Sequence, residues 1–253
     1  MSSAGQEMPA SQQQPLGLDA ALELLRDGEL ALEGRLLDAS NATLFGSVCA
    51  GDLVAQCVYK PVRGERPLWD FPDGTLAGRE VATYEVSAAS GWSVVPPTVL
   101  RDGPFGEGSC QLWIDVDDDV DLPALARSEH PALRRMALFD AVVNNADRKG
   151  GHLLPVDDPP PVGHVYGVDH GVTFHVEDKL RTLLWGWRGQ RISADERAVL
   201  ERLRLDVDLD ERLRALLTRR EVAAYHRRID RLLRTGRFPQ PSQDWPAIPW
   251  PPF

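Results

Sequence analysis

The stretch Asn144-Asn145-Ala146-Asp147-Arg148-Lys149-Gly150-Gly151-His152 is the most informative part of this 253-residue sequence. It directly follows the apolar segment 133–143, and the apolar pair Leu153-Leu154 comes directly after it. A polar loop between two buried segments must pair several donors and acceptors at once. Because Asn-Asn-Ala-Asp is also a good helix stop, the loop alone leaves a purely structural explanation open.

A second polar group surrounds Asp169 in the stretch Tyr166-Gly167-Val168-Asp169-His170-Gly171-Val172. The carboxylate stands between an apolar, strand-like segment and Gly171, and glycine permits backbone angles that other residues avoid. In isolation, such an aspartate either caps a turn or serves a bound group.

Lys60 ends an expected strand over residues 53–60. Because side chains alternate along a strand, Lys60 shares its face with Val58 and Val54, so a lysine stands on a partly apolar face. A strand-end lysine that reaches solvent is the ordinary explanation for such a position.

Glu80 lies near the start of the next expected helix, over residues 78–90, and is the partner that we predict for Lys60. A buried ammonium group needs a carboxylate beside it. Glu85 is the competing partner, but five residues correspond to about 140° around a helix, so the two glutamates cannot both point inward. The chain thus has, in order, a strand lysine, a helix glutamate, a loop aspartate and an Asp-x-Gly motif. Chance produces this whole order far less often than it produces any one of the four features.

The apolar pattern predicts a small sheet followed by a helical part. The expected elements are a short helix over 18–25, strands over 30–37, 43–49 and 53–60 in an antiparallel meander, the helix 78–90 ended by Gly91, strands over 94–100 and 108–114, and helices over 131–144, 193–205, 209–217 and 220–234. We therefore predict an α+β fold of two lobes. Residues 18–115 would form an N-terminal lobe with a five-stranded antiparallel sheet and one helix, and residues 116–237 a helical C-terminal lobe, with a hinge near 113–119.

Two segments lie outside these lobes. Residues 1–17 are mostly Ser, Gln, Pro, Gly and Ala, which bury too little to order the chain, so we expect a disordered arm. Residues 238–253 carry six prolines with Trp245, Trp250 and Phe253 between them, which excludes regular helix and central strand. This tail is either pinned across the body by its aromatic side chains or binds a protein partner.

Charge and cysteine usage exclude several classes of protein. Lys and Arg number 28 against 38 Asp and Glu, and the formal charge of -10 opposes general binding to nucleic acid. Three cysteines in apolar stretches, with no pair at metal spacing, indicate buried thiols in a reducing compartment. No apolar run approaches the roughly 20 residues of a transmembrane segment. The sequence therefore predicts a cytoplasmic protein.

In this order, the motifs resemble the phosphatidylinositol 3- and 4-kinase-like branch of the protein-kinase-like fold, the branch that also resembles HipA-type kinases. The similar stretches are residues 58–61, 79–85, 95–99, 145–149 and 168–171, within a span from about 34 to 187. In that family the catalytic loop reads Asp-Arg-His-x-x-Asn and the metal motif reads Asp-x-Gly. Here they correspond to Asp147-Arg148-Lys149-Gly150-Gly151-His152 and Asp169-His170-Gly171.

The resemblance implies an ATP-dependent phosphotransferase with a hydroxyl-bearing acceptor. Lys60, oriented by Glu80, would neutralise the α- and β-phosphates, because phosphoryl transfer depends on positioning and charge stabilisation. Val58 would cover the adenine. The backbone of residues 111–114 would hydrogen-bond the adenine edge, which assigns Gln111, Trp113 and Ile114 to the nucleotide site.

The resemblance also implies the roles of the two loops. Asp147 would orient the acceptor hydroxyl and take its proton, and Arg148 would hold either that loop or the transferring phosphate. Asp169 would ligate Mg²⁺ together with phosphate oxygens. His152 stands where the family has an Asn as second metal ligand, and imidazole suits Mn²⁺ better than Mg²⁺, so the metal preference is open.

The turn 38–43 lacks phosphate-binding glycines, which leaves the hydroxyls of Ser40 and Thr43 as substitutes.

The sequence leaves open the class of acceptor and two functions other than phosphoryl transfer. A protein or small-molecule acceptor is favoured over a lipid, because a charge of -10 does not suit an anionic membrane surface. A nucleotide-binding pseudokinase that switches a partner through the tail is a second reading, and His152 is its main support. A third is nucleotidyl transfer on the same fold.

Overall fold

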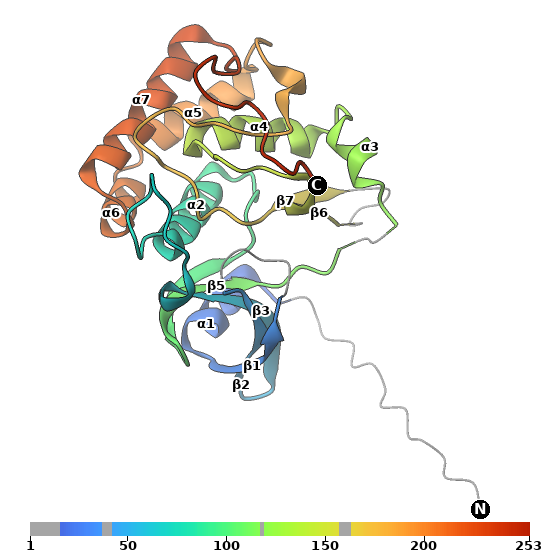
Figure 1. Ribbon diagram of the computed structural model, residues 1–253, viewed down its shortest axis with the longest axis vertical. Helices are drawn as coiled ribbons and strands as arrows, with labels where there is room; N and C mark the ends of the chain where they lie inside the picture. The colour runs from blue at the N-terminus through green and yellow to red at the C-terminus, as the bar shows by residue number, and fades with distance from the viewer. Residues whose placement is uncertain (1–15, 37–41, 117–118, 157–162) are drawn as a thin grey trace, which may run out of the picture.

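The computed structural model describes residues 16–36, 42–116, 119–156 and 163–253. It has a small lobe built on a β-sheet and a larger helical lobe, one above the other in Figure 1. Most of the arm expected over residues 1–17, Ser40 and most of the phosphate-covering turn lie outside the described residues. Within them, the mixed α+β fold that the sequence predicts is confirmed.

The N-terminal lobe is a five-stranded antiparallel sheet in the order β1-β2-β3-β5-β4. Its strands are β1 (Glu29–Arg35), β2 (Leu44–Ala50), β3 (Leu53–Pro61), β4 (Thr98–Gly103) and β5 (Gly106–Leu112). The first three form the expected meander. β4 begins four residues later than expected from Val94, because Pro96 and Pro97 have no N–H group to donate to a ladder.

A helix that precedes the sheet covers one of its faces. In α1 (Leu18–Asp27), the buried side chains Ala21, Leu24 and Leu25 lie at the spacing of one helix face. They pack against buried side chains of the strands, among them Val48 and Cys57. The lobe thus has α1 against its sheet in addition to the single helix that the sequence associated with it.

The helix α2 (Leu76–Ser90) lies between the sheet and the helical lobe and ends at Gly91, which has a positive φ of 71° as the sequence predicted for a helix-ending glycine. Arg79, 1% exposed, bonds the Thr173 carbonyl at 2.7 Å and also pairs with Glu221 of the C-terminal lobe. The helix that carries Glu80 is therefore fixed to the larger lobe.

The C-terminal lobe is built around α4 (Pro131–Val143), which is buried along almost its whole length. The other helices of this lobe are α3 (Leu122–Ala126), α5 (Ala194–Leu205), α6 (Val207–Leu216) and α7 (Arg219–Thr235), and α7 packs against α4. The capping boxes Ser193 with Glu196 and Thr218 with Glu221 begin α5 and α7. A short hairpin, β6 (Leu153–Val156) with β7 (His164–Gly167), follows the polar loop 144–152. The strand-like segment before Asp169 was expected, but its pairing with a second strand was not.

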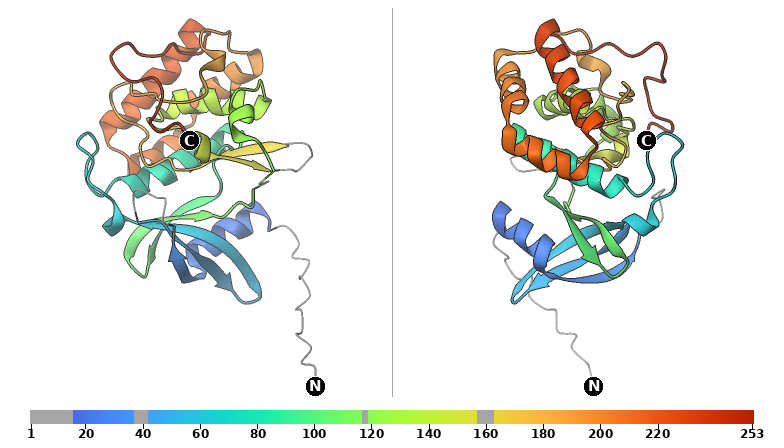
Figure 2. Two further views of the ribbon diagram at one scale, coloured as in Figure 1. Left: turned by 45° about the vertical axis from the view of Figure 1, so that its right-hand side comes forward. Right: turned by 90° about the vertical axis from the view of Figure 1, so that its left-hand side faces the viewer.

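The C-terminal tail follows α7 and runs across the larger lobe to end beside the β6–β7 hairpin (Figures 1 and 2). The Ala247 carbonyl accepts hydrogen bonds from Thr182 N–H at 3.1 Å and from Trp185 Nε1 at 2.8 Å. The expectation of a tail held against the body is confirmed. Of the described helices, none has the length and apolar character needed to cross a bilayer.

Candidate active site between the lobes

Lys60 lies near the C-terminal end of β3, on the side of the strand that faces away from α1. Its neighbours Cys57 and Tyr59 are fully buried, whereas Val58 and Lys60 alternate with them and are partly exposed. This alternation turns the lysine side chain toward the helical lobe.

Lys60 is held by two carboxylates. Its Nζ lies 2.6 Å from Glu80 Oε1 and 3.0 Å from Asp169 Oδ1. The second oxygen of Glu80 accepts a hydrogen bond from the His170 N–H at 3.0 Å. Strand β3, helix α2 and the Asp169 loop, separated by up to 109 residues, thus meet in one polar cluster.

Of the two glutamates considered for Lys60, the structure brings Glu80 to it and not Glu85. The Glu80 side chain is 4% exposed, whereas Glu85 pairs with Arg212 of α6 at 2.7 Å on the outer side of α2. The angular separation along the helix explains this division.

The charges in the cluster support one another. Burial disfavours the ammonium, but Asp169 and Glu80 together outweigh it, so the pKa of Lys60 is raised. The Lys60 ammonium lowers the pKa of Asp169 against the opposing effect of burial, with His152 and the Lys60 hydrogen bond contributing further. Both groups are therefore charged near neutral pH. Asp169 keeps half of its side chain exposed, at 50%, and so remains accessible to a bound group.

Asp169 has a positive φ of 61°, a left-handed conformation that is uncommon outside glycine and that asparagine and aspartate adopt more readily than other side chains. This turn aims one carboxylate oxygen at Lys60 and the other at His152, whose Nε2 lies 3.4 Å away. The sequence signal for the unusual backbone was Gly171, but the strained residue is Asp169 itself.

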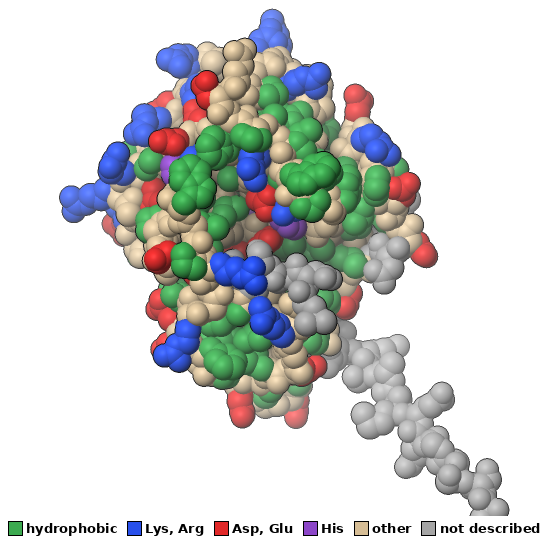
Figure 3. Space-filling view, in the orientation of Figure 1, with side chains coloured by type: hydrophobic (Ala, Val, Ile, Leu, Met, Phe, Trp, Pro, Cys, Tyr) green, Lys and Arg blue, Asp and Glu red, His purple; other side chains and the backbone are tan. Residues whose placement is uncertain are grey.

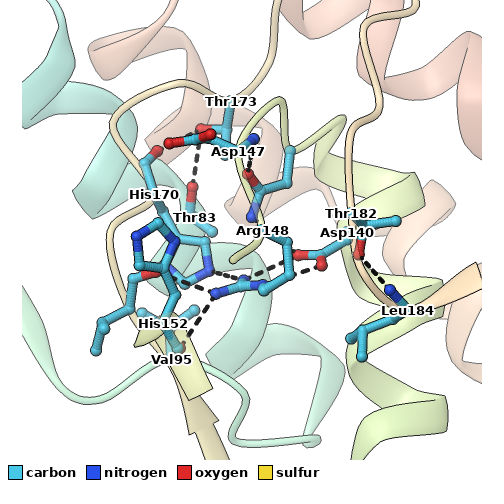
Figure 4. A network of polar contacts seen from close by, with 12 residues as sticks. Thr83, Val95, Asp140, Asp147, Arg148, His152, His170, Thr173, Thr182 and Leu184 are labelled. Carbon is cyan, nitrogen blue, oxygen red and sulfur yellow. Dashed lines mark hydrogen bonds and ion pairs between the residues drawn. The ribbon is translucent and has the colours of Figure 1, made fainter. Parts of the chain in front are cut away.

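Arg148 supports the loop from inside the protein (Figure 4). Both Arg148 and Asp140 of α4 are 0% exposed, and Arg148 Nε and Nη2 lie 3.0 and 2.9 Å from the two oxygens of Asp140. Arg148 also donates to the Val168 carbonyl at 3.1 Å and contacts His170 Nε2. Of the two roles predicted for Arg148, holding the loop agrees with this position. Contact with a transferring phosphate does not, because the guanidinium is enclosed.

Asp147 stands at the surface of the same loop and is 25% exposed. Its carboxylate lies 3.0 Å from Lys149 Nζ and 3.6 Å from Arg181 Nη2. Asp147 and Asp169 line one cleft of about 390 Å³. The adjacent residues Asp147 and Arg148 therefore point in different directions. Arg148 faces the protein interior and Asp147 faces the cleft.

His152 and Asp169 are the residues that would hold a divalent metal. Burial lowers the pKa of His152 more than Asp169 raises it, so the imidazole is neutral near neutral pH. Within the described residues, no three His, Cys, Asp or Glu side chains form a metal-binding group. The donor set fits a metal that takes its remaining ligands from nucleotide phosphates and water, as Mg²⁺ commonly does.

The residues predicted to contact the adenine lie in β3, in β5 and just past the end of β5. Val58 is partly exposed, and Gln111 is 7% exposed with its side chain bonded to Thr98 Oγ1 at 2.8 Å. The N–H of Trp113 donates to the Gln56 carbonyl at 3.0 Å. Within the predicted segment, Ile114 lies past the end of β5, where the chain leaves for the second lobe.

Glu65 is a neighbour of the site that sequence reasoning missed. Its carboxylate accepts hydrogen bonds from the N–H groups of Leu76 at 3.2 Å and Ala77 at 2.8 Å, and so caps the start of α2. It lines a small cavity with Lys60, Glu80 and Asp169. The cap lies eleven residues from the helix in sequence, beyond the range in which a capping signal is recognised.

Comparisons with solved structures identify the class of fold. The Golgi casein kinase with Mn/ADP bound aligns with a TM-score of 0.61 and 14% identity, over 86% of this chain and 75% of that one. Hydra Fam20 with sugar aligns with a TM-score of 0.58 and 14% identity, over 86% and 87%. The Helicobacter pylori proinflammatory kinase CtkA aligns with a TM-score of 0.53 and 11% identity, over 85% and 94%. The chain has a protein-kinase-like fold.

Sequence comparison adds a family. The chain is 45% identical to protein Rv2133c of Mycobacterium tuberculosis over 267 residues, which covers 91% of this chain and 94% of that protein. It belongs to the same family as Rv2133c. No family model matches the sequence.

Proposed function

We propose that this protein is an ATP-dependent phosphotransferase that moves the γ-phosphate of ATP to a hydroxyl acceptor. The observation that carries the proposal is the cluster of Lys60, Glu80 and Asp169, which joins a strand cation, a helix carboxylate and a loop carboxylate with contacts of 2.6 and 3.0 Å. The kinase-like fold of the chain and the Mn/ADP bound by one structural neighbour support it.

In this proposal, Lys60 binds the α- and β-phosphates while Glu80 keeps the ammonium oriented. A fixed cation stabilises the charge of the phosphates without having to reorganise during the reaction. Because α2 is anchored by Arg79 to the C-terminal lobe, Glu80 is held in place before the nucleotide arrives. Val58 covers the adenine, and the segment from Gln111 through Trp113 to Ile114 borders it.

Asp147 is the residue that orients the acceptor hydroxyl and takes its proton. It faces the cleft, and the buried Arg148 beside it holds the loop in place. Asp169 and His152 would hold Mg²⁺ or Mn²⁺, and the metal would neutralise negative charge on the phosphates. Carboxylate suits both metals, and the imidazole shifts the preference toward Mn²⁺.

The finer assignments are parts of the same proposal. The motif 58–61 and the Asp169-His170-Gly171 turn support the phosphatidylinositol 3- and 4-kinase-like and HipA-like branch. The lobes extend over residues 18–115 and 116–237. Three free cysteines support a reducing, cytoplasmic location. A protein or small-molecule acceptor is favoured over a lipid by the net charge of -10.

Phosphorus NMR of the full chain with ATP tests the proposal, with Mg²⁺ and Mn²⁺ compared. We expect slow formation of ADP with water as the acceptor, which Asp169→Ala lacks. Lys60→Ala loses nucleotide binding, whereas Asp147→Ala retains binding and loses turnover. Full turnover in Asp147→Ala would overturn the assignment of that residue.

The same spectra separate the alternatives. AMP with pyrophosphate would indicate nucleotidyl transfer instead. ATP resonances that shift without turnover would indicate a pseudokinase, a reading that His152 in place of Asn favours. Unchanged ATP resonances in the wild-type protein would remove nucleotide binding altogether.

A further inference from the structure

The cleft that contains Asp147 and Asp169 is also lined by three tryptophans, and we call it the aromatic cleft. Its walls include Trp69 from the connection between β3 and α2 and Trp245 and Trp250 from the tail. Its volume of about 390 Å³ is that of a site for a small molecule. Hydrophobic side chains flank acidic, basic and histidine side chains where the two lobes meet in Figure 3.

Two of these indoles are unusually exposed. Trp69 is 84% and Trp250 is 87% accessible, the highest values among the exposed large hydrophobic side chains of the described residues. Single exposed hydrophobic residues are ordinary, but two at the rim of one cleft form an apolar surface next to a catalytic carboxylate. The flat apolar surface of an indole can pack against the face of a ring in a bound molecule.

The aromatic walls are fixed by the protein beneath them. Lys179, 2% exposed, lies with its Nζ 4.7 Å from the ring centre of Trp69 and 4.6 Å from that of Trp245. The same Nζ pairs with Asp70 at 2.6 Å. This ammonium joins the connection before α2 to the tail, so the two walls keep their spacing when the cleft is empty.

The tail is also fixed to the catalytic loop. Gly150 N–H donates to the Pro252 carbonyl at 2.8 Å, two residues beyond Trp250. Thr182, whose N–H donates to the Ala247 carbonyl of the tail, is followed by Leu183. The N–H of Leu183 donates to the Arg148 carbonyl at 3.2 Å. Trp250 is therefore positioned relative to Asp147 through a short series of backbone hydrogen bonds.

The polar lining of the cleft has both signs of charge in contact with each other. Asp147 lies near Lys149 and Arg181, and Asp169 is paired with Lys60. Because Lys149 and Arg181 already have Asp147 as a carboxylate partner, these two cations do not select a strongly anionic acceptor. It offers carboxylate oxygens to accept from hydroxyl groups and N–H groups to donate to them.

We propose that the aromatic cleft binds the acceptor and that this acceptor is a small polyhydroxylated ring, a sugar or cyclitol. The proposal rests on the phosphotransferase function proposed above and names its substrate class. The ring packs its C–H face on Trp250 and Trp69 and directs one hydroxyl to Asp147. The bond between the γ-phosphorus and the oxygen that bridges it to the β-phosphate breaks, a bond from the acceptor oxygen to the γ-phosphorus forms, and Asp147 takes the hydroxyl proton.

Saturation-transfer NMR on the full chain tests this inference, with methyl β-D-glucopyranoside and myo-inositol as the probes. We expect transfer to the ring C–H protons of at least one probe, about fivefold weaker in Trp250→Ala and in Trp69→Ala. Trp250→Phe keeps an aromatic face and should retain part of the signal. Phe105→Ala, which removes an exposed aromatic ring from the β4–β5 turn, is the matched control and should change nothing.

Three results would overturn the inference. The first is absence of transfer to either probe, and the second is transfer that neither tryptophan variant reduces. The third is ADP formation stimulated by dephosphorylated casein and not by the probes, which would indicate a polypeptide acceptor. ATP binding by the wild-type protein is followed separately by phosphorus NMR. Ring binding without ATP binding would therefore remove the phosphotransferase while leaving the ring site in place.

Discussion

Arg148 and Asp140 form a two-pronged ion pair of 2.9 and 3.0 Å in which both side chains are wholly buried. The pair ties the loop that presents Asp147 to the central helix α4 (Figure 4). Removing one partner of a buried pair leaves the other charge uncompensated, which costs about 3–5 kcal/mol.

We therefore expect Arg148→Ala to lower the free energy of unfolding by about 3–5 kcal/mol, measured by urea denaturation of the full chain. The exposed pair of Arg204 with Asp230, at 2.7 Å, supplies the control. Arg204→Ala should cost less than about 1 kcal/mol. Equal losses in the two variants would show that burial of the Arg148 pair is not what makes it important.

A second prediction concerns the partner of Lys60. Glu80→Gln removes a charge 2.6 Å from the Lys60 ammonium, whereas Glu85→Gln removes one that pairs with Arg212 outside the cluster. We expect Glu80→Gln to weaken ATP binding by at least about tenfold, because a charge-assisted hydrogen bond contributes about 1.5–3 kcal/mol. Glu85→Gln should stay close to the wild-type protein. Titrations of ATP followed by phosphorus NMR compare the two, and a larger loss in Glu85→Gln would contradict the assignment.

Much of the fold could be predicted from local patterns. The alternation that ends at Lys60 and the periodicity of α2 and α4 each depend on neighbouring residues, so the elements and their order are visible in the sequence. Helix geometry also predicted that Glu80 and Glu85 could not both point inward, although it did not select between them. These features need no knowledge of what lies far away along the chain.

The parts that could not be predicted depend on long-range contacts. Glu65 caps a helix eleven residues away, and Lys179 lies between Trp69 and Trp245, which come from distant segments. The inward orientation of Arg148 depends on Asp140 being buried at the same depth. For each of these residues, the surrounding sequence contains no pattern from which its partner could be predicted.

A third prediction concerns acid stability through Glu221 at the start of α7. Burial would raise the pKa of Glu221, but hydrogen bonds from Thr218 and the contact with Arg79 outweigh it, so this pKa is lowered from its ordinary 4.5. A carboxyl whose pKa is lower in the folded state contributes stability that is complete above its unfolded pKa. That contribution is lost as the pH falls through the folded pKa.

Accordingly, the stability difference between the wild-type protein and Glu221→Gln should be largest at neutral pH and shrink below pH 4.5. Urea denaturation at a series of pH values measures it. Glu201→Gln alters an exposed i,i+4 pair with Arg197 and should show little difference at any pH. A Glu221→Gln difference that stays constant with pH would contradict the linkage.

A fourth prediction concerns the metal. If His152 is the second metal-binding side chain, His152→Asn replaces imidazole by an amide oxygen, a ligand that Mg²⁺ prefers. The ratio of ATP affinity with Mg²⁺ to that with Mn²⁺ should therefore rise in His152→Asn. His164→Asn, in the β6–β7 hairpin outside the site, is the control. An unchanged ratio would exclude His152 from the metal site.

The last prediction uses two adjacent glycines to test whether the tail braces the loop 144–152. A Cβ added at Gly150 would lie 2.0 Å from ring carbons of Phe253, whereas a Cβ at Gly151 would have nothing within 4 Å. Gly150→Ala must therefore displace the Phe253 ring and weaken the adjacent hydrogen bond to Pro252, while Gly151→Ala should not. We expect faster proteolysis within the tail and slower ATP turnover in Gly150→Ala alone. Because the clash requires the ring, adding Gly150→Ala to Phe253→Ala should cause little further change, a non-additivity that a contact pair produces. Additive effects of the two substitutions would show that Gly150 acts on the loop independently of the tail.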